Sequence, residues 1–436
     1  MQKARAWRGT LGAWRWRIAA LLCLITTINY LDRQALAITG PVLIREFGLT
    51  NTQFGLINSA FLFAYAFGHL LVGLIIDRLG TRRAFKFAVV AWSIAGIMHA
   101  AGRGFASLLL LRGVLGLTEA ANFPAALKSV AEWFPKADRS LAVGIVTMGP
   151  GLGAIIAPPV LGSLALAFGW QAAFLVPGLA GFLWLWIWLA WYELPERHAR
   201  ISASERDLIL AERAPPQSGK EAIRWSVLLG YFRHREVWGL VLSRFSNDGA
   251  FYFFVTWLPT YLAQVQGFDL RKIAAFAWIP FLAADIGSLA GGWSAQSLIR
   301  RGTSLDAARK RLIWIGALLV VVSLFPLITG SAWIAIAAIG LAMFAIQFKA
   351  ANLFALPVDL FPPQEVGGVW GLFGAIGSLG GMAFVAAAGW VSEHYAYDPV
   401  FWAVGVTQLL SAVFVSLLIP TIAPLDRKSG IQRSAA

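Results

Sequence analysis

Charged side chains lie inside stretches of sequence that are otherwise apolar, and their spacing indicates proton and anion chemistry. Asp32 and Arg33 are adjacent in one stretch, and Arg112 and Glu119 are seven residues apart in another. Seven residues are about two helical turns, roughly 10 Å, so Arg112 and Glu119 can line the same cavity. A charge in a hydrocarbon interior costs roughly 2.5–3.5 kcal/mol or more. Each of these side chains should therefore be paired, face a cavity and serve a function.

The residue types predict different roles for these four side chains. Arginine does not deprotonate in practice, so Arg33 and Arg112 suit permanent binding of an anion. A buried carboxylate without a full-time partner can take up and release a proton near neutral pH, so we expect Glu119 to be the main proton carrier and Asp32 a second, coupled site. Adjacent helical residues point about 100° apart, and the preferred pairing is Asp32 with Arg112, which leaves Arg33 to meet an anion. The alternative is a static charge network that only stabilises helix packing.

The second half of the chain contains a further set of charges in apolar surroundings. Arg244 and Asp248 are four residues apart and either pair with each other or serve the substrate. Lys349 is predicted to pair with Asp285 or to contact the substrate directly.

Two uncharged polar residues in the second half leave a similar choice. Asn352 and Ser378 either hydrogen-bond substrate hydroxyls or make helix–helix contacts.

The composition places these residues in a membrane. Of 436 residues, 58% are hydrophobic and 13% are charged, whereas a soluble chain carries about a quarter charged residues. Segments of about 20 apolar residues, long enough to cross a hydrocarbon core of about 30 Å, recur along the chain. The expected spans are 18–44, 54–76, 84–101, 105–127, 140–166, 171–192, 236–263, 273–298, 312–328, 332–358, 366–390 and 399–420. Cys23 is the single cysteine, which excludes a disulfide framework or a Cys/His metal cluster, and we predict no cofactor besides the coupling proton.

The net charge of +14 is distributed in a way that predicts topology. Lys and Arg concentrate in the termini and in the connections that follow even-numbered spans, as the positive-inside rule requires of cytoplasmic segments. Both termini and the long central connection are therefore expected in the cytoplasm, and the basicity does not indicate a nucleic-acid site. Because Asp32 and Arg33 lie within the first span, we predict a retained helix and not a cleaved signal peptide.

Two bundles of six helices are predicted, in residues 1–192 and 236–436, joined by a charged cytoplasmic linker, 193–235. Within the linker, Ser202 and Glu205 have the spacing of a capping box that opens a helix.

The two halves also repeat each other. E-W-F-P at 132–135 matches D-L-F-P at 359–362, an offset of 227 residues. At the same offset, four residues have identical counterparts: Gly144, Leu152, Gly153 and Phe174 match Gly371, Leu379, Gly380 and Phe401. A duplicated six-helix unit is typical of transporters that move two bundles about a central site. The predicted fold is thus an all-α membrane protein with twelve transmembrane helices in two pseudo-symmetric bundles.

The connection after the second span, Gly73–Arg83, has the sequence G-L-I-I-D-R-L-G-T-R-R. It resembles the signature loop of the major facilitator superfamily. Its glycine permits close helix approach, while its acid and arginines can hold one face of the protein through a charge network. The predicted latch residues are Gly73, Asp77, Arg78, Gly80, Arg82 and Arg83. A second copy, 291–302, lacks the acid.

Longer motifs resemble the anion:cation symporter family of that superfamily. They are N-Y-L-D-R at 29–33, the run from Arg112 through E-A-A-N-F-P to A-E-W-F-P at 131–135, and I-A-P-P at 156–159. W-L-P-T-Y-L at 257–262 resembles the hexuronate/aldonate branch, as does W-I-P-F-L-A-A-D-I-G at 278–287. This resemblance covers most of the chain. It implies a multi-pass protein of the bacterial inner membrane, expected to be monomeric, that imports sugar acids together with protons.

The resemblance also carries roles onto individual residues. The coupling acids of the family fall on Asp32 and Glu119, and its arginines on Arg33 and Arg112. Its substrate-lining positions fall on or beside Tyr30, Tyr65, Arg244, Asn352, Phe354 and Ser378. Lys349 departs from the small or polar residues usual in that stretch.

The leading functional hypothesis is a proton-coupled importer of a small organic monoanion, most simply a hexuronate or aldonate. Alternatives are an importer of aromatic or dicarboxylate anions, an anion exchanger or exporter, and a non-transporting nutrient sensor. An enzyme is not expected, because the embedded residues include neither a nucleophile–base pair nor a metal-ligand set. The expected partners are the small anion and the lipid bilayer.

Overall fold

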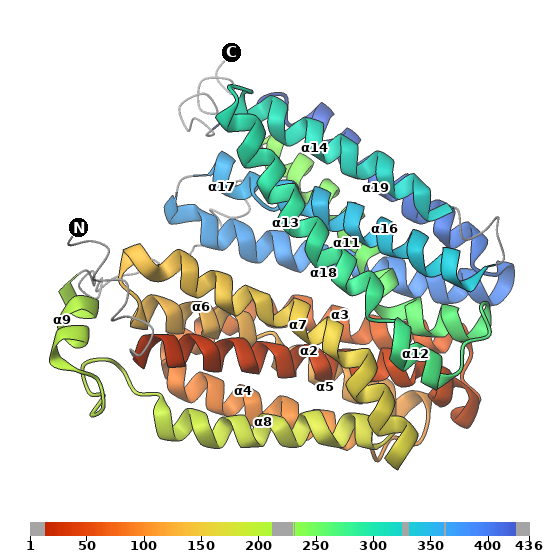
Figure 1. Ribbon diagram of the computed structural model, residues 1–436, viewed down its shortest axis with the longest axis horizontal. Coiled ribbons are helices and arrows are strands. Elements are labelled where there is room, and N and C mark those ends of the chain that lie inside the picture. Colours follow the sequence, from red (N-terminus) through yellow and green to blue (C-terminus); the bar gives the residue numbers. More distant parts are fainter. Residues whose placement is uncertain (1–13, 212–229, 231, 325–330, 362, 424–436) are drawn as a thin grey trace. The chain divides into compact units, whose positions relative to one another are not determined.

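The helices of the computed structural model begin and end close to the predicted spans. The structure describes residues 14–211, 230, 232–324, 331–361 and 363–423. Every regular element in this part of the chain is a helix, and no strand occurs there (Figure 1).

Two compact units make up the chain, and each is described by itself. The first contains residues 1–220 and 256–278, and the second contains 221–255 and 279–436. Helix α11, Arg235–Gln264, contributes its first part to the second unit and its last part to the first. The boundary predicted at the linker, residues 193–235, between two six-helix bundles stays a prediction.

The helices of the first unit are α2 Trp14–Phe47, α3 Asn51–Leu79, α4 Thr81–His99, α5 Phe105–Glu119, α6 Asn122–Trp133, α7 Lys136–Phe168, α8 Ala172–Trp191, α9 Ala203–Ala211 and α12 Leu270–Phe276. Within this unit α2 packs along α7, α3 along α5, and α4 along α8 (Figure 1).

The second unit contains the first part of α11 together with α13 Ile279–Arg300, α14 Leu305–Val320, η1 Val321–Leu324, α16 Ala332–Leu353, α17 Leu356–Leu360, α18 Pro363–Tyr395 and α19 Asp398–Leu418. Here α13 and α14 both pack against α16, and α19 packs against α14 and α18.

Three of the predicted spans are interrupted, which corrects the expectation of continuous helices: 105–127, 273–298 and 332–358. Helices α5, α12 and α16 each end four or five residues before a proline, namely Pro124, Pro280 and Pro357. Proline has no N–H to continue the helical ladder, and its ring clashes with the carbonyl group about one turn earlier. Each proline then lies in the first turn of the next helix, where it is tolerated.

Seven spans in the described part of the chain are long and apolar enough to cross a membrane. They are 51–72, 137–168, 172–191, 270–300, 332–360, 369–395 and 398–418. Helices α5 and α14 fall short in length, with 15 and 16 residues, and α2 and α11 carry charged residues along their length. Three of these four helices, α2, α5 and α11, carry candidate site residues.

The predicted repeat is confirmed in the helix boundaries. Helices α7 and α18 both have 33 residues, and their two ends are offset by the same 227 residues as the sequence motifs. The helices before them, α6 and α17, are followed by the matched C-cap residues Phe134 and Phe361, which share an extended backbone conformation.

Matched glycines bring matched helices together. A Cβ atom on Gly153 of α7 would lie 2.6 Å from the Cβ atom of Tyr30 on α2. A Cβ atom on Gly380 of α18 would overlap the carbonyl oxygen of Phe245 on α11. Membrane helices associate through such close backbone approach at small residues, because apolar side chains gain little from leaving lipid.

The predicted capping box in the linker is only half confirmed. The Ser202 hydroxyl accepts a hydrogen bond from the Glu205 amide at 3.2 Å, and α9 begins there. The Glu205 carboxylate accepts from the amides of Trp14 at 3.2 Å and Arg15 at 3.1 Å, at the first residues of α2. The Arg15 guanidinium bridges Glu205 and Asp138 at 3.4 and 3.3 Å. A carboxylate favours the positive end of a helix dipole, so α9 is tied to α2 and α7.

Gly380→Ala is expected to destabilise the protein by about 1–3 kcal/mol, because the added methyl group must displace the α11 backbone. Gly371→Ala on the same helix is the control: a Cβ atom there meets nothing within 4 Å. That substitution should be neutral or stabilising by up to about 1 kcal/mol, since alanine favours helix more than glycine. Thermal unfolding of the purified variants in one detergent measures both. Equal melting temperatures for the two variants would contradict the close packing of α18 on α11.

Candidate functional site

The four charges singled out in the first half are all buried in the first unit. Asp32 and Arg33 lie midway along α2, and Arg112 and Glu119 lie on α5. Their exposed fractions are 2%, 7%, 2% and 0%, respectively. Because α5 ends at Glu119, the helix interruption explained by Pro124 directly follows this carboxylate.

Arg33 pairs with Glu119, which corrects the predicted pairing of Asp32 with Arg112. The Nε and Nη2 atoms of Arg33 donate to Glu119 Oε2 at 3.3 and 3.1 Å. Arg112 donates from Nη2 to the backbone carbonyl of Arg33 at 2.9 Å. The reason is rotational: residues 32 and 33 point about 100° apart on α2, and the face that meets α5 carries Arg33.

Asp32 points instead toward α4. A Cβ atom on Gly96 would lie 3.2 Å from Asp32 Oδ1, so the absence of a side chain there makes room for the carboxylate. Neither carboxylate oxygen accepts a hydrogen bond within the described part of the chain. Arg112 and Glu119 act on Asp32 electrostatically, the first favourably and the second unfavourably. The role of Asp32 as a second, coupled proton site stays a prediction.

Three aromatic rings surround the Arg33 guanidinium. Its central carbon lies 4.6 Å from the ring centroid of Tyr30, 4.9 Å from Phe61 and 4.5 Å from Tyr65. Arg112 also lies 5.5 Å from Phe61. A cation over an aromatic face is stabilised by roughly 0.5–2 kcal/mol, more where water is excluded. Tyr30 and Tyr65, expected near the substrate, thus lie beside the arginine expected to bind it.

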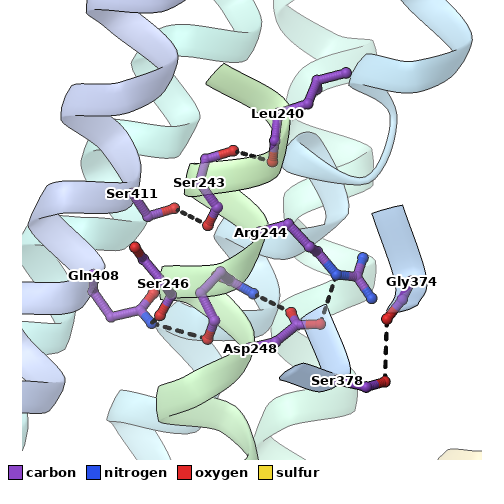
Figure 2. Close-up of polar contacts among 10 residues, drawn as sticks. Leu240, Ser243, Arg244, Ser246, Asp248, Gly374, Ser378, Gln408 and Ser411 are labelled. Atoms are coloured by element: carbon purple, nitrogen blue, oxygen red, sulfur yellow. Dashed lines mark hydrogen bonds and ion pairs between the residues drawn. The ribbon is translucent and has the colours of Figure 1, made fainter. Parts of the chain in front are cut away.

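Arg244 and Asp248 of the second unit form an i, i+4 ion pair, one of the two alternatives left open for them. Arg244 Nε donates to Asp248 Oδ2 at 2.6 Å, and the Asn247 amide donates to Oδ1 at 3.1 Å (Figure 2). The guanidinium carbon lies 3.7 Å from the ring centroid of Phe354 and 4.8 Å from Phe373. The structure therefore brings the predicted residues Arg244 and Phe354 together.

The uncharged polar candidates are occupied within their own unit. The Asn352 amide donates to the carbonyls of Gly291 and Phe348 at 3.3 and 3.2 Å, and its oxygen accepts from Arg309 at 3.2 Å. The Ser378 hydroxyl donates to Gly374 of the same helix at 3.1 Å (Figure 2). The Asn352 contact with Gly291 matches the helix-packing alternative, whereas the Ser378 hydrogen bond stays within its own helix. Direct substrate roles for both residues stay predictions.

The predicted pairing of Lys349 with Asp285 is wrong. Lys349 is fully buried and donates to the backbone carbonyl of Gln408 at 3.2 Å. Among the described ion pairs, none joins Lys349 to Asp285.

The predicted latch is only partly visible. Gly73 and the side chain of Asp77 lie outside the described part of the chain. Arg82 pairs with Glu193 at 2.6 Å and donates to the Leu189 carbonyl at 2.7 Å, which ties the start of α4 to the end of α8. Gly80 joins α3 to α4 with a φ of 73°, a conformation that favours glycine.

Arg78 and Arg83, the remaining latch arginines, are exposed. A latch role for the six residues stays a prediction.

Two aromatic residues of the candidate sites were not anticipated. Phe61 precedes Tyr65 by one helical turn, so the 3.6-residue period of α3 would have placed it on the same face. Phe373 of α18 contacts Arg244 of α11 from a distant part of the sequence, and no local pattern indicates that contact.

Removal of either partner of the Arg33–Glu119 pair is expected to lower the unfolding free energy by about 3–5 kcal/mol, because the other charge stays buried alone. Glu119→Gln and Arg33→Met should each lower Tm, and the double variant should recover much of the loss. The matched cycle uses Arg82→Met and Glu193→Gln, a pair with exposed fractions of 41% and 37%, where the coupling should not exceed about 1 kcal/mol. Thermal unfolding of all six variants gives both couplings. Additive losses at Arg33 and Glu119 would contradict a direct interaction.

Comparisons with known proteins agree with this architecture. The chain matches the Major Facilitator Superfamily over residues 22–305 and 302–435. It is 33% identical over 407 residues to the hexuronate transporter of Escherichia coli strain K12, covering 92% of this chain and 93% of that protein. It is 30% identical over 421 residues to the D-galactonate transporter of Escherichia coli O6:H1, covering 94% and 96%.

A solved structure shares the fold. The inward-facing, unoccupied form of a bacterial homologue of the human lysosomal transporter Spinster superposes with a TM-score of 0.76 at 18% identity, covering 94% of this chain and 98% of that one. The chain therefore belongs to the major facilitator superfamily, as a membrane transporter with twelve transmembrane helices in two six-helix bundles, and it is not an enzyme.

Proposed function

We propose that the protein is a proton-coupled symporter that imports a small sugar-acid monoanion, a hexuronate or an aldonate. The observation that carries the proposal is the buried ion pair between Arg33 and Glu119. An arginine suited to an organic anion is held by a carboxylate that can be neutralised by a proton. The similarity to hexuronate and D-galactonate transporters supports the substrate class.

Proton coupling follows from competition for one guanidinium. While Glu119 is ionised, it occupies Arg33, and a substrate carboxylate would have to displace it. A proton on Glu119 removes its charge, so Arg33 can exchange it for the substrate. Asp32 serves as the second proton site, because burying an ionised carboxylate without hydrogen-bond donors is costly and protonation removes that cost.

The aromatic residues around Arg33 suit a polyhydroxylated acid. Tyr30 and Tyr65 are only partly buried, and their phenol groups can donate to sugar hydroxyls while their rings hold the guanidinium in place. Arg112 holds the backbone at Arg33 and adds positive charge to the site. The arginine would then bind the carboxylate as a bidentate partner.

In the second unit, we assign Arg244 as a further substrate contact, with Phe354 as its stacking partner. Substrate binding can drive alternating access only through different affinities for the two states of the carrier. A contact in each bundle would supply that difference. Asn352 and Ser378 complete the proposed substrate-binding set.

The remaining assignments rest on the charge distribution and the family. We propose that the protein functions as a monomer in the bacterial inner membrane, with both termini in the cytoplasm. Gly73, Asp77 and Arg78, with Gly80, Arg82 and Arg83, are proposed to hold one conformation closed.

Uptake driven by an inward proton gradient tests the proposal. Proteoliposomes are supplied with glucuronate, galacturonate, galactonate, gluconate or phthalate. We expect uptake of one or more sugar acids, and Glu119→Gln should reduce gradient-driven uptake at least about tenfold, because the variant cannot release a proton from this position. Counterflow exchange should persist in this variant, because it needs no net proton movement.

Glu236→Gln is the control, since this carboxylate pairs with the exposed Arg235 at the start of α11, outside the proposed site and latch. Gradient-independent exchange by the wild type would favour an anion exchanger. Uptake of phthalate alone would favour the aromatic-carboxylate importer, and no uptake of any acid would remove the substrate assignment.

A further inference from the structure

A lysine that the proposed mechanism does not use lies in the middle of the second unit. Lys349 of α16 has no exposed surface. Its Cβ atom would lie 2.7 Å from a Cβ atom placed on Gly316, so α14 approaches it closely on one side. Its ammonium donates to the carbonyl of Gln408 on α19 at 3.2 Å. A buried amine in apolar surroundings is costly unless a negative charge compensates it.

Asp248 lies on the turn of α11 that Gln408 also contacts, and among the described ion pairs none joins Asp248 to Lys349. In the structure Asp248 Oδ2 accepts a hydrogen bond from Arg244 Nε at 2.6 Å. Its other oxygen, Oδ1, accepts a hydrogen bond from the Asn247 amide. Ammonium groups have three donor positions, and Lys349 uses one of them in the described contacts.

The backbone around this acid is held by α19. The Gln408 amide donates to the carbonyl of Asn247 at 3.1 Å, and the Ser411 hydroxyl donates to the carbonyl of Ser243 at 2.9 Å (Figure 2). Gln408 thus contacts both Lys349 and the turn of α11 that carries Asp248.

The glycine beside the ion pair makes room for the Asp248 carboxylate. A Cβ atom on Gly377 of α18 would overlap Asp248 Oδ2 and lie 2.7 Å from Arg244 Nε. The three charged side chains of this cluster, Arg244, Asp248 and Lys349, comprise two cations and one anion. An anion that binds Arg244 balances the second cation.

We propose that Lys349 is a positioning residue that takes over Asp248 when a substrate carboxylate occupies Arg244. This inference rests on the proposed function, in which Arg244 binds the substrate. Without a second cation, release of Arg244 would leave Asp248 as an unpaired buried anion, and that anion would compete with the substrate. With Lys349 available, the Arg244–Asp248 pair is replaced by two pairs, Arg244 with the substrate and Lys349 with Asp248.

Substrate binding to the purified transporter tests the exchange. Lys349→Met should weaken binding of the transported sugar acid about tenfold, and Lys349→Arg should restore it, because charge and not side-chain shape is required. In an Asp248→Asn background, Lys349→Met should change the dissociation constant less than about twofold, since no competing anion remains. Lys128→Met is the control. Lys128 is partly buried and, like Lys349, donates to a backbone carbonyl, that of Ile76. Equal losses from Lys349→Met in both backgrounds would overturn the inference.

A second measurement needs no substrate. Arg244→Met releases Asp248 in the way that a bound carboxylate would. Lys349→Met should then lower Tm more in the Arg244→Met background than in the wild type, because Asp248 has lost both cations. Equal Tm decreases would overturn the inference whether or not sugar acids bind. A larger decrease in a protein that binds none of the acids would refute the proposed function and leave the pairing of Asp248 with Lys349 supported.

Discussion

The ion pair between Arg33 and Glu119 is the constraint on which the first unit depends. Both groups are almost completely removed from solvent, so neither charge is acceptable without the other. The pair also joins the middle of α2 to the end of α5, two helices that are far apart in sequence. Any ligand or proton that changes one partner must change the free energy of the other. A stabilising contact can thereby also serve as the coupling element of a transporter.

The second unit likewise pairs an arginine with a carboxylate in its interior. Arg244 and Asp248 lie on successive turns of one helix, so their ion pair is local. The fold of the second unit therefore depends less on this pair than the first unit depends on its own. The guanidinium gains its position from aromatic rings, with Phe354 only 3.7 Å away. In both units an arginine is fixed by an acid on one side and by rings on the other. Such a cation is preorganised, and little side-chain entropy remains to be lost when an anion binds.

Glycines and prolines determine which face of each helix carries these charges. The contact of Gly153 with Tyr30 sets how α7 lies on α2, and the space at Gly96 admits Asp32. The rotation of α2 is therefore decided by its neighbours, and it directs Asp32 toward α4 and Arg33 toward α5. Pro124 belongs to the same arrangement, because the helix ends at Glu119 and the buried carboxylate therefore lies at a helix terminus.

The sequence by itself indicated the membrane class and the approximate spans, because the thickness of a bilayer and the cost of buried charge act on any sequence. Motifs at a constant offset of 227 residues indicated the two-fold repeat. The same reasoning identified Asp32, Arg33, Arg112 and Glu119 as buried charges, and pairing of Arg244 with Asp248 as one of two alternatives. The tertiary structure decided the partners: Arg33 and not Asp32 meets α5, Lys349 meets Gln408 and not Asp285, and Glu205 caps a helix 190 residues away. Helical spacing fixes the direction of a side chain only relative to its own axis. The rotation of that axis against its neighbours depends on long-range packing, which local sequence does not contain.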